Sequence, residues 1–329
     1  MAKRHIKFFR YYKEWINTYK KFEVQDATFN RYQNTCRYIT ENYSDLYLDD
    51  MTRQKLQLIM NKYGETHEIE TCRAFLHSIQ ASLRDAVYEG WLKKDPTYKV
   101  IATSQVGHKV TRKKYLEEDQ VEKLEKVMQK DHSVTSIMCD FDLRTGLRFA
   151  EVLGLTPADV DLKDKTIYVK QTWDYKKGAN ADFKSTKNKY SVRMVSIDDH
   201  AVEDLQHVML GVQQNEPIFV KALTLEVQNK HLDRFRKPYH KYIPIYNATI
   251  DLRLTEWCKE AGIPRVTFHN LRHTHASLLI ANGVSIQTVA KRLGHANTIT
   301  TQKVYIHLLD KLRAKDNQRI AEVMNGVGN

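Results

Sequence analysis

Residues 269–275 read HNLRHTH and hold three histidines and an arginine. His269 and His273 stand four residues apart, which is the spacing of two zinc ligands on one face of a helix. A hydrolytic zinc site of the H-E-x-x-H type also needs a carboxylate between the two histidines, and this segment has none there. Arg272 would instead repel a cation bound beside it. We therefore expect no metal at this segment.

Arg272 is better suited to an anion. It follows His269 by three residues, so the two side chains share a face of a helix. A guanidinium fork can bind two oxygens of a phosphate, and an imidazole beside it can carry a proton. On these residues alone, packed core histidines and a phosphate site remain equal alternatives. His275 falls off this face, and we expect a structural role for it.

Two further segments favour the phosphate site. In RTGLRFAEVLGL, Arg148 follows the helix-breaking Gly146 and begins a new helix, whose free N–H groups and dipole favour an anion. Glu151, three residues on, can hold the Arg148 guanidinium in place. Downstream, RLGHANTITTQKVYIHL supplies His295 and then Tyr305, which lies in an otherwise apolar helical stretch.

A mainly helical chain must position these residues. Its 329 residues are enough for two domains. In the first hundred residues, apolar side chains recur at a period of 3.6, which predicts helices over 8–19, 26–43 and 71–92. A polar, basic segment without this periodicity follows. We therefore predict a helical domain over 1–106 and a second domain over 107–329.

The second domain combines helices with a few strands. Alternating patterns predict antiparallel strands in 159–173 and 190–197, joined by a lysine-rich connection. Helical periodicity predicts the remaining elements, which are 116–129, 134–146, 249–262, 268–283, 285–294 and 300–324. The expected fold class is mainly α with a small antiparallel β-sheet.

The bulk composition describes a soluble chain, and its charge favours a polyanionic partner over the alternative of a solvated basic surface without one. Lys and Arg outnumber Asp and Glu by 52 to 40, a formal charge of +12, and nucleic acid is the commonest partner of such a chain. The charged N-terminus has no apolar core of a signal peptide, and no stretch is apolar enough to span a membrane. Four cysteines lie far apart, as expected for reduced thiols. We expect the cytoplasm of a bacterial host.

Taken together, these segments resemble the tyrosine recombinases, the integrase family of phages and transposons. The family pattern T-G-L-R-x-x-E-x-L-x-L appears as TGLRFAEVLGL, and its H-x-L-R-H-T box appears as HNLRHT. LGH matches a third box, and TKNKYSVR fits the T-K-x-x-x-S-x-R pattern of the lysine hairpin. The resemblance covers most of the chain and implies a SAM-like core-binding domain followed by an α+β catalytic domain.

The resemblance also implies a role for each site residue. Arg148 and Arg272 would neutralise the charge that grows on a phosphodiester in its transition state. Tyr305 would attack the phosphorus and form a 3′-phosphotyrosyl link, and Lys187, with Lys189 as its neighbouring competitor, would protonate the leaving 5′-oxygen. His269 would help to take the tyrosine proton, and His295 would hydrogen-bond the phosphate or the leaving oxygen. Glu151 would orient an arginine.

The partners implied are double-stranded DNA with attachment sites, a homotetramer on that DNA, and an accessory directionality factor. The expected reaction integrates or excises a mobile element or prophage, and it uses no metal, no ATP and no cofactor. The chain begins almost directly at the core-binding helices, so we expect no separate domain for arm-type DNA sites.

Three alternatives come from other classes. A DNA-binding regulator could use 278–294, which has the pattern of a helix-turn-helix. A metal-dependent transposase or nuclease could recruit Asp140 and Asp142, although a third acid is lacking. A type IB topoisomerase would share the phosphotyrosine chemistry without site preference.

Overall fold

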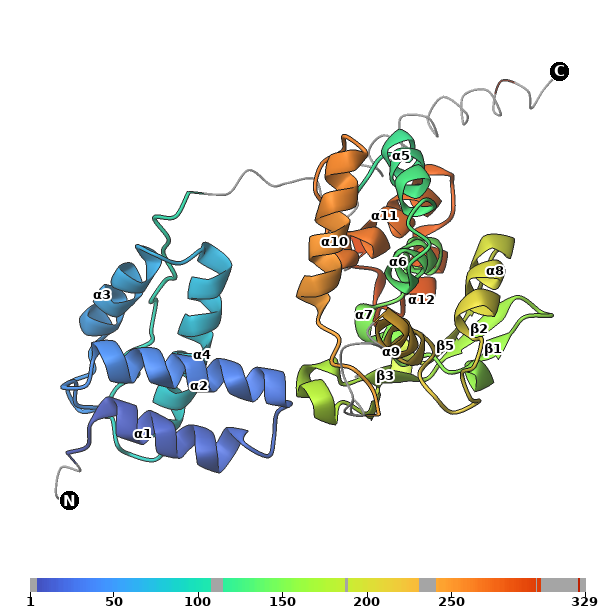
Figure 1. Cartoon of the computed structure of the whole chain (residues 1–329). Helices are drawn as coiled ribbons and strands as arrows, with labels where there is room; N and C mark the ends of the chain where they lie inside the picture. Colours follow the sequence, from blue (N-terminus) through green and yellow to red (C-terminus); the bar gives the residue numbers. More distant parts are fainter. Residues whose placement is uncertain are drawn as a thin grey trace. The chain divides into compact units, whose positions relative to one another are not determined.

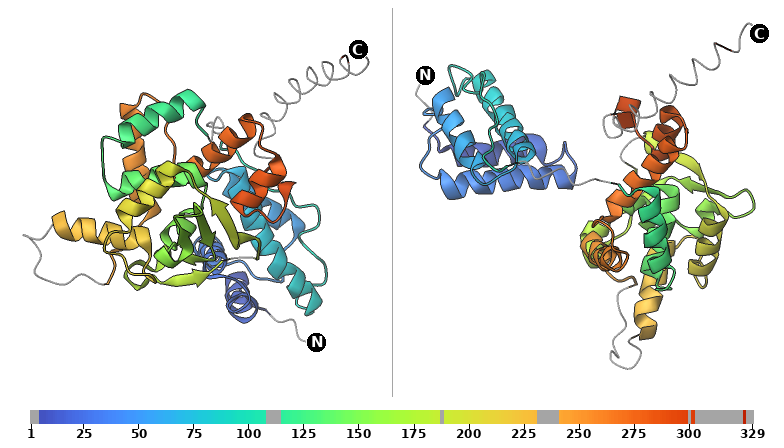
Figure 2. Two further views of the ribbon diagram at one scale, coloured as in Figure 1. Left: turned by 90° about the vertical axis from the view of Figure 1, so that its right-hand side faces the viewer. Right: turned by 90° about the horizontal axis from the view of Figure 1, so that it is seen from above.

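The structure is a computed structural model that describes residues 5–107, 115–186, 189–230, 241–299, 301–302 and 325. The chain forms two compact units, residues 1–112 and 113–329. Figures 1 and 2 show the first unit in blue to cyan and the second in green to red. Each unit has its own hydrophobic core.

The first unit is helical throughout its regular elements. These are α1 (Phe8–Trp15), which continues into the π-helix η1 (Ile16–Lys20), then α2 (Asp26–Asn42), α3 (Arg53–Gly64) and α4 (Ile69–Tyr88). Aromatic side chains of α1 enter the core, as their helical spacing predicts, and Tyr12 is fully buried against Ser78 of α4. The segment after α4 packs back onto this unit, because Gln105 N donates to Gly64 O at 2.8 Å.

The second unit surrounds one central helix. The helix α6 (Val134–Thr145) packs against several others, among them α5 (Glu118–Met128), α8 (Asp199–Val208), α9 (Ile218–Lys230) and α11 (Phe268–Ala281). Figure 1 shows α6 in the middle of these helices. The remaining helices are the short α7 (Phe149–Leu153), α10 (Asn247–Glu260), α12 (Ile286–Leu293) and the 3-10 turns η2 (Pro157–Asp159), η3 (Tyr175–Asn180) and η4 (Lys189–Ser191).

The strands of the second unit form two antiparallel sheets. One has the order β1-β2-β5, from β1 (Val160–Asp161), β2 (Thr166–Val169) and β5 (Arg193–Ser196). The other pairs β3 (Gln171–Trp173) with β4 (Phe183–Ser185). Residues alternate between the core and the surface along β5, where Arg193 and Val195 are buried and Met194 is exposed. This alternation turns Arg193 toward the interior.

The fold class, mainly α with small antiparallel sheets, is confirmed, and the differences concern individual elements. The run 159–173 divides at Lys170 into strands of two sheets, whereas the sequence predicted one sheet. Helices α3, α8 and α9 were not predicted. The closing helix over 300–324 lies almost entirely outside the described residues.

The four cysteines are buried as free thiols. Burial raises the pKa of each of them, so the neutral thiol is favoured. Nowhere in the described ranges does a helix have the length and apolar character needed to cross a membrane.

Candidate active site

The site is built on the C-terminal ends of two helices. Helix α6 ends at Gly146 and helix α12 ends at Gly294, and both glycines adopt the left-handed conformation, with φ of 65° and 68°. A glycine takes this conformation without the steric cost of a Cβ atom. The last carbonyl groups of a helix have no partner within it, and the helix dipole makes that end attractive to cations.

Arg272 of α11 joins these two helix ends. Its Nη1 donates to Gly146 O at 2.6 Å, and its Nη2 donates to Leu293 O at 2.6 Å. The side chain is buried, with 3% of the residue exposed. Burial, together with the nearby Arg148, lowers the pKa of Arg272 to about 10, which still leaves it charged at neutral pH.

Arg148 reaches the end of α12 from a different side. It is the residue before α7, and its Nη2 donates to Gly294 O at 3.1 Å. Its Nη1 donates to Glu151 Oε1 at 2.7 Å, and its backbone N–H donates to Glu151 Oε2 at 3.0 Å. The side chain is 37% exposed, so Arg148 keeps a surface for a ligand while Glu151 is buried beneath it.

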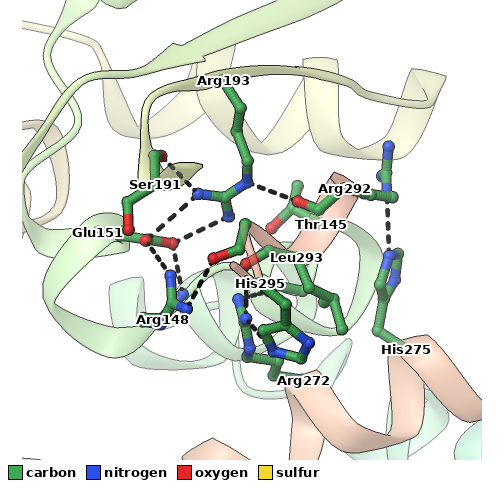
Figure 3. Close-up of polar contacts among 12 residues, drawn as sticks. Thr145, Arg148, Glu151, Ser191, Arg193, Arg272, His275, Arg292, Leu293 and His295 are labelled. Carbon is green, nitrogen blue, oxygen red and sulfur yellow. Dashed lines mark hydrogen bonds and ion pairs between the residues drawn. The ribbon is translucent and has the colours of Figure 1, made fainter. Parts of the chain in front are cut away.

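Arg193 is a second cation on Glu151, and the sequence analysis assigned no role to it. Its two terminal nitrogens lie 3.2 and 3.0 Å from the two carboxylate oxygens, and its Nε donates to Arg292 O at 2.5 Å. Figure 3 shows Glu151 between Arg148 and Arg193. Burial acts to raise the pKa of Glu151, but Arg193 first and then Arg148 lower it below its ordinary value. Glu151 is therefore ionised.

His295 follows Gly294 and lies against Arg272. Its Nε2 is 3.2 Å from Arg272 Nη2, which can only donate, so Nε2 accepts and the ring proton is on Nδ1. Nδ1 then donates to Thr301 Oγ1 at 2.8 Å. Burial, followed by the charges of Arg272 and Arg148, lowers the pKa of His295 to about 4. The ring is thus neutral, with one acceptor nitrogen beside the arginine.

A layer below the site holds α12 in place. Arg292 Nε donates to His275 Nε2 at 2.9 Å, and the other ring nitrogen of His275 donates to Leu143 O at 2.9 Å. Arg292 also donates to Ser196 Oγ and Ser196 O of β5. Burial lowers the pKa of His275 to about 3, so this ring is neutral as well. The side chain lies in the interior, in line with a structural role.

Asp142 lies fully buried on α6 within the field of Arg272. Neither carboxylate oxygen has a hydrogen-bond partner among the described residues. Burial raises the pKa of Asp142 well above its ordinary value, against the opposing effect of Arg272, and so favours the neutral form of the carboxyl group. Asp140, the other acid considered for a nuclease, accepts from Arg144 Nε at 2.6 Å. The two acids are directed to different surroundings, and in the described ranges no three metal-binding side chains form a metal site.

The structure brings four of the predicted residues together, namely Arg148, Glu151, Arg272 and His295. His269 is exposed on α11, where its ring lies edge-on to His273 at 4.8 Å. Lys187 and Tyr305 lie outside the described residues, as does the side chain of Lys189. Two guanidinium groups and an imidazole in one place are suited to an oxyanion such as a phosphate.

Family models match both units. The phage integrase family matches residues 114–311, and the phage integrase SAM-like domain matches residues 7–100. The first match alone covers more than half of the chain.

Individual proteins agree with these matches. The chain is 27% identical over 316 residues to a XerC-like tyrosine recombinase of Caldanaerobacter subterraneus subsp. tengcongensis, covering 90% of this chain and 78% of that protein. It is 34% identical over 188 residues to the integrase of Staphylococcus phage L54a, covering 55% of this chain and 49% of that protein. The chain is also 27% identical over 292 residues to the ICEBs1 integrase of Bacillus subtilis, covering 86% of this chain and 75% of that protein.

Solved structures show the same fold. The integrase of transposon Tn1549 in complex with a circular intermediate DNA superposes with a TM-score of 0.72 at 18% identity, covering 94% of this chain and 98% of that one. A lambda integrase dimer bound to a core site gives a TM-score of 0.65 at 16% identity, covering 92% of this chain and 78% of that one.

Proposed function

The chain belongs to the phage integrase family, and from this premise we propose that it is a site-specific tyrosine recombinase that cleaves and rejoins double-stranded DNA at attachment sites. Its reaction integrates or excises a mobile element or prophage. The observation that carries the proposal is the convergence of Arg148 and Arg272 on the end of α12, beside a neutral His295. Two cations from different elements can then contact one phosphate from two sides.

The two arginines supply transition-state stabilisation. Displacement at a phosphodiester adds negative charge to the phosphoryl oxygens, and fixed guanidinium donors stabilise that charge more strongly than they stabilise the ground state. Arg272 is buried and held by two carbonyl groups, so its position changes little when the phosphate enters. Arg148 is the more exposed of the two and provides the outer contact.

Two of the residues that carry the covalent chemistry, Tyr305 and Lys187, lie outside the described ranges. The Tyr305 hydroxyl attacks the phosphorus and forms a 3′-phosphotyrosyl bond, while the bond from phosphorus to the 5′-oxygen breaks. Lys187 gives a proton to that oxygen, and His269 helps to take the tyrosine proton. The energy of the broken bond stays in the phosphotyrosine, so a 5′-hydroxyl of another strand can reverse the step without ATP, and the scheme needs no metal.

His295 changes its role as charge develops. Its Nε2 accepts from Arg272, so this nitrogen of the neutral ring cannot donate to a phosphate. A nearby anion raises the pKa of an imidazole. His295 can then take up a proton and donate to the phosphate or the leaving oxygen as the transition state is reached.

Assembly follows from the need to exchange strands. A homotetramer of this chain would hold two duplexes, and an accessory directionality factor would choose between integration and excision. A lambda integrase tetramer has been solved on a Holliday junction. The recombination reaction would take place in the cytoplasm of a bacterial host, which contains the DNA.

The regulator remains the second candidate, because α11, the Asn282-Gly283 turn and α12 do form a helix-turn-helix. In this arrangement, however, Arg272 and Leu293 are buried and hydrogen-bonded to each other, and Arg148 reaches the same helix end from the surface through Gly294 O. A DNA-binding helix needs no such cluster of buried arginines. Covalent chemistry therefore accounts for more of the structure.

The deciding experiment uses Tyr305→Phe. A hydroxyl contributes about 1 kcal/mol through a hydrogen bond, so the variant should stay folded and bind DNA. The probe is a duplex that the chain selects from a randomised pool, nicked near the cleavage position so that the short leaving strand diffuses away. Wild type and the control Tyr242→Phe should form a covalent adduct without added metal, and Tyr305→Phe should form none.

Mass spectrometry should place the phosphate of the wild-type adduct on Tyr305. An adduct that persists in Tyr305→Phe would move the nucleophile to another residue. Selected DNA that is bound tightly by wild type but never joined to it would favour the regulator.

A further inference from the structure

Arg193 shares the carboxylate of Glu151 with Arg148, and the two cations differ in exposure. The Arg193 side chain contacts both carboxylate oxygens of Glu151 and is 6% exposed. The Arg148 side chain contacts one of these oxygens and is 37% exposed. Both terminal nitrogens of Arg193 contact the Glu151 carboxylate, so its charge is compensated there and is not offered at the surface that Arg148 presents. Its charge therefore acts on Glu151.

We propose that Arg193 is a positioning residue that neutralises Glu151, so that the charge of Arg148 stays available to the scissile phosphate. This inference rests on the proposed recombinase function. Without Arg193, the ionised Glu151 would have Arg148 as its nearest cation, and that ion pair would cancel the charge offered to the phosphate. With Arg193 present, Glu151 can orient Arg148 without neutralising it.

The balance of charges supports this division of labour. Three guanidinium groups, those of Arg148, Arg193 and Arg272, surround one ionised carboxylate, so two positive charges remain uncompensated. Asp142 forms no hydrogen bond or ion pair with these arginines among the described residues, and its burial favours the neutral carboxyl group, which adds no negative charge to this balance. Removing Arg193 would leave one uncompensated charge for a transition state that carries more negative charge than the ground state.

A second contact of Arg193 extends its influence to the end of α12. Its Nε donates to Arg292 O, two residues before the carbonyl group that receives Arg148. A Cβ atom on Gly294 would lie 3.0 Å from Arg193 Nη1, so the glycine also makes room for this guanidinium. Arg193 therefore positions both the carboxylate and the backbone that hold Arg148.

The test compares Arg193→Met, Arg193→Lys and the double variant Arg193→Met with Glu151→Gln, using the nicked duplex described above. Arg193→Met should slow adduct formation by about 10²-fold, because Arg148 would then be neutralised by Glu151 and lost as a transition-state donor. The lysine variant keeps the charge but not the fork and should lose less. The double variant removes the carboxylate together with its cation, so it should regain part of the lost rate.

A structural role alone would give a different result. If Arg193 served only to fold the domain, Arg193→Met would lower the melting temperature, and the protein that stays folded would form the adduct at the wild-type rate. The pH profile gives a second signature. Glu151 takes up a proton more easily without Arg193, so the loss of rate in Arg193→Met should be smaller at about pH 6 than at about pH 8. Lys170→Met is the matched control. Lys170 forms an ion pair with the buried Asp159, with 2.5 Å between Nζ and Oδ1, and neither residue belongs to the site. It should leave the rate of adduct formation unchanged.

Circular dichroism and thermal melting report whether each variant is folded. If Arg193→Met does not fold, the lysine and double variants carry the comparison. Adduct formation at the wild-type rate in Arg193→Met, or a double variant slower than Arg193→Met, overturns the role of Arg193 while the recombinase function stands. A wild-type protein that forms no adduct overturns the recombinase function, and this inference with it.

Discussion

Replacing Gly146 by alanine would place a methyl group against the ring of His275. A Cβ atom at this position would lie 2.5 Å from His275 Cδ2 and 3.1 Å from a methyl group of Leu293. The ring cannot move aside easily, because it is buried and hydrogen-bonded at both nitrogens. The backbone cannot move freely either, since Gly146 O accepts from Arg272.

Two separate costs add up in Gly146→Ala. A residue with a Cβ atom in the left-handed conformation costs about 1–2 kcal/mol. Overpacking a close-packed interior costs typically about 1–3 kcal/mol more. We therefore expect a loss of roughly 2–5 kcal/mol in the free energy of unfolding. DNA cleavage should also be slower, because a displaced carbonyl group at position 146 would shift Arg272.

Gly262→Ala isolates the first cost. Gly262 has φ of 66°, but no atom lies within 4 Å of an added Cβ. Urea unfolding at neutral pH should show a loss of about 1–2 kcal/mol for this variant. Adding His275→Ala to Gly146→Ala should relieve the clash, so the two changes should be less than additive. Equal losses for Gly146→Ala and Gly262→Ala would refute the idea that His275 is fixed.

Further predictions concern charge and protons. Arg148→Lys should stay folded and bind DNA yet lose most cleavage, since lysine cannot donate to Glu151 and a phosphate through a rigid fork; near-normal adduct formation would contradict this. Lys187→Ala should be partly rescued by a substrate with sulfur at the bridging 5′ position, because a thiolate leaves without a proton, and rescue of Lys189→Ala instead would reassign the acid. The folded pKa of His275, about 3, lies below its ordinary 6.5, so the unfolded chain binds the proton more readily and stability falls as the pH drops from about 6.5 toward 3. Urea unfolding at several pH values should show a shallower fall for His275→Gln, and equal slopes would count against a neutral, buried ring.

Much of the fold follows from local signals that the chain carries plainly. The helix breaks at Gly146 and Gly262 are visible in the sequence, and both glycines adopt positive φ. Helix α9 was missed because its first turn, Ile218–Val220, is buried on all sides, which removes the alternation that marks a surface helix. Helix α3 was missed although Leu56, Ile59 and Met60 recur at helical spacing, so the signal was present.

The site was predictable where residues interact along the chain. Arg148 and Glu151 lie three residues apart at the start of a helix, and their contact follows from that spacing. The contact of Glu151 with Arg193 joins α7 to β5, and no local pattern predicts such a pairing. Arg193 closes the pattern TKNKYSVR, which marked the position but not the partner. The same holds for Arg292, whose contacts with His275 and Ser196 depend on the packing of three elements.

Three of the acceptors that hold Arg148 and Arg272 in the candidate site belong to the main chain. Gly146 O, Leu293 O and Gly294 O receive them, and a carbonyl group is the same for every amino acid. Leu293 can therefore be replaced by another apolar residue without loss of the carbonyl acceptor for Arg272. Gly146 and Gly294 cannot be replaced in the same way, because their left-handed backbone conformation directs these carbonyl groups toward the arginines. Among distant descendants of this chain, the shape of two helix ends should outlast the residues around them.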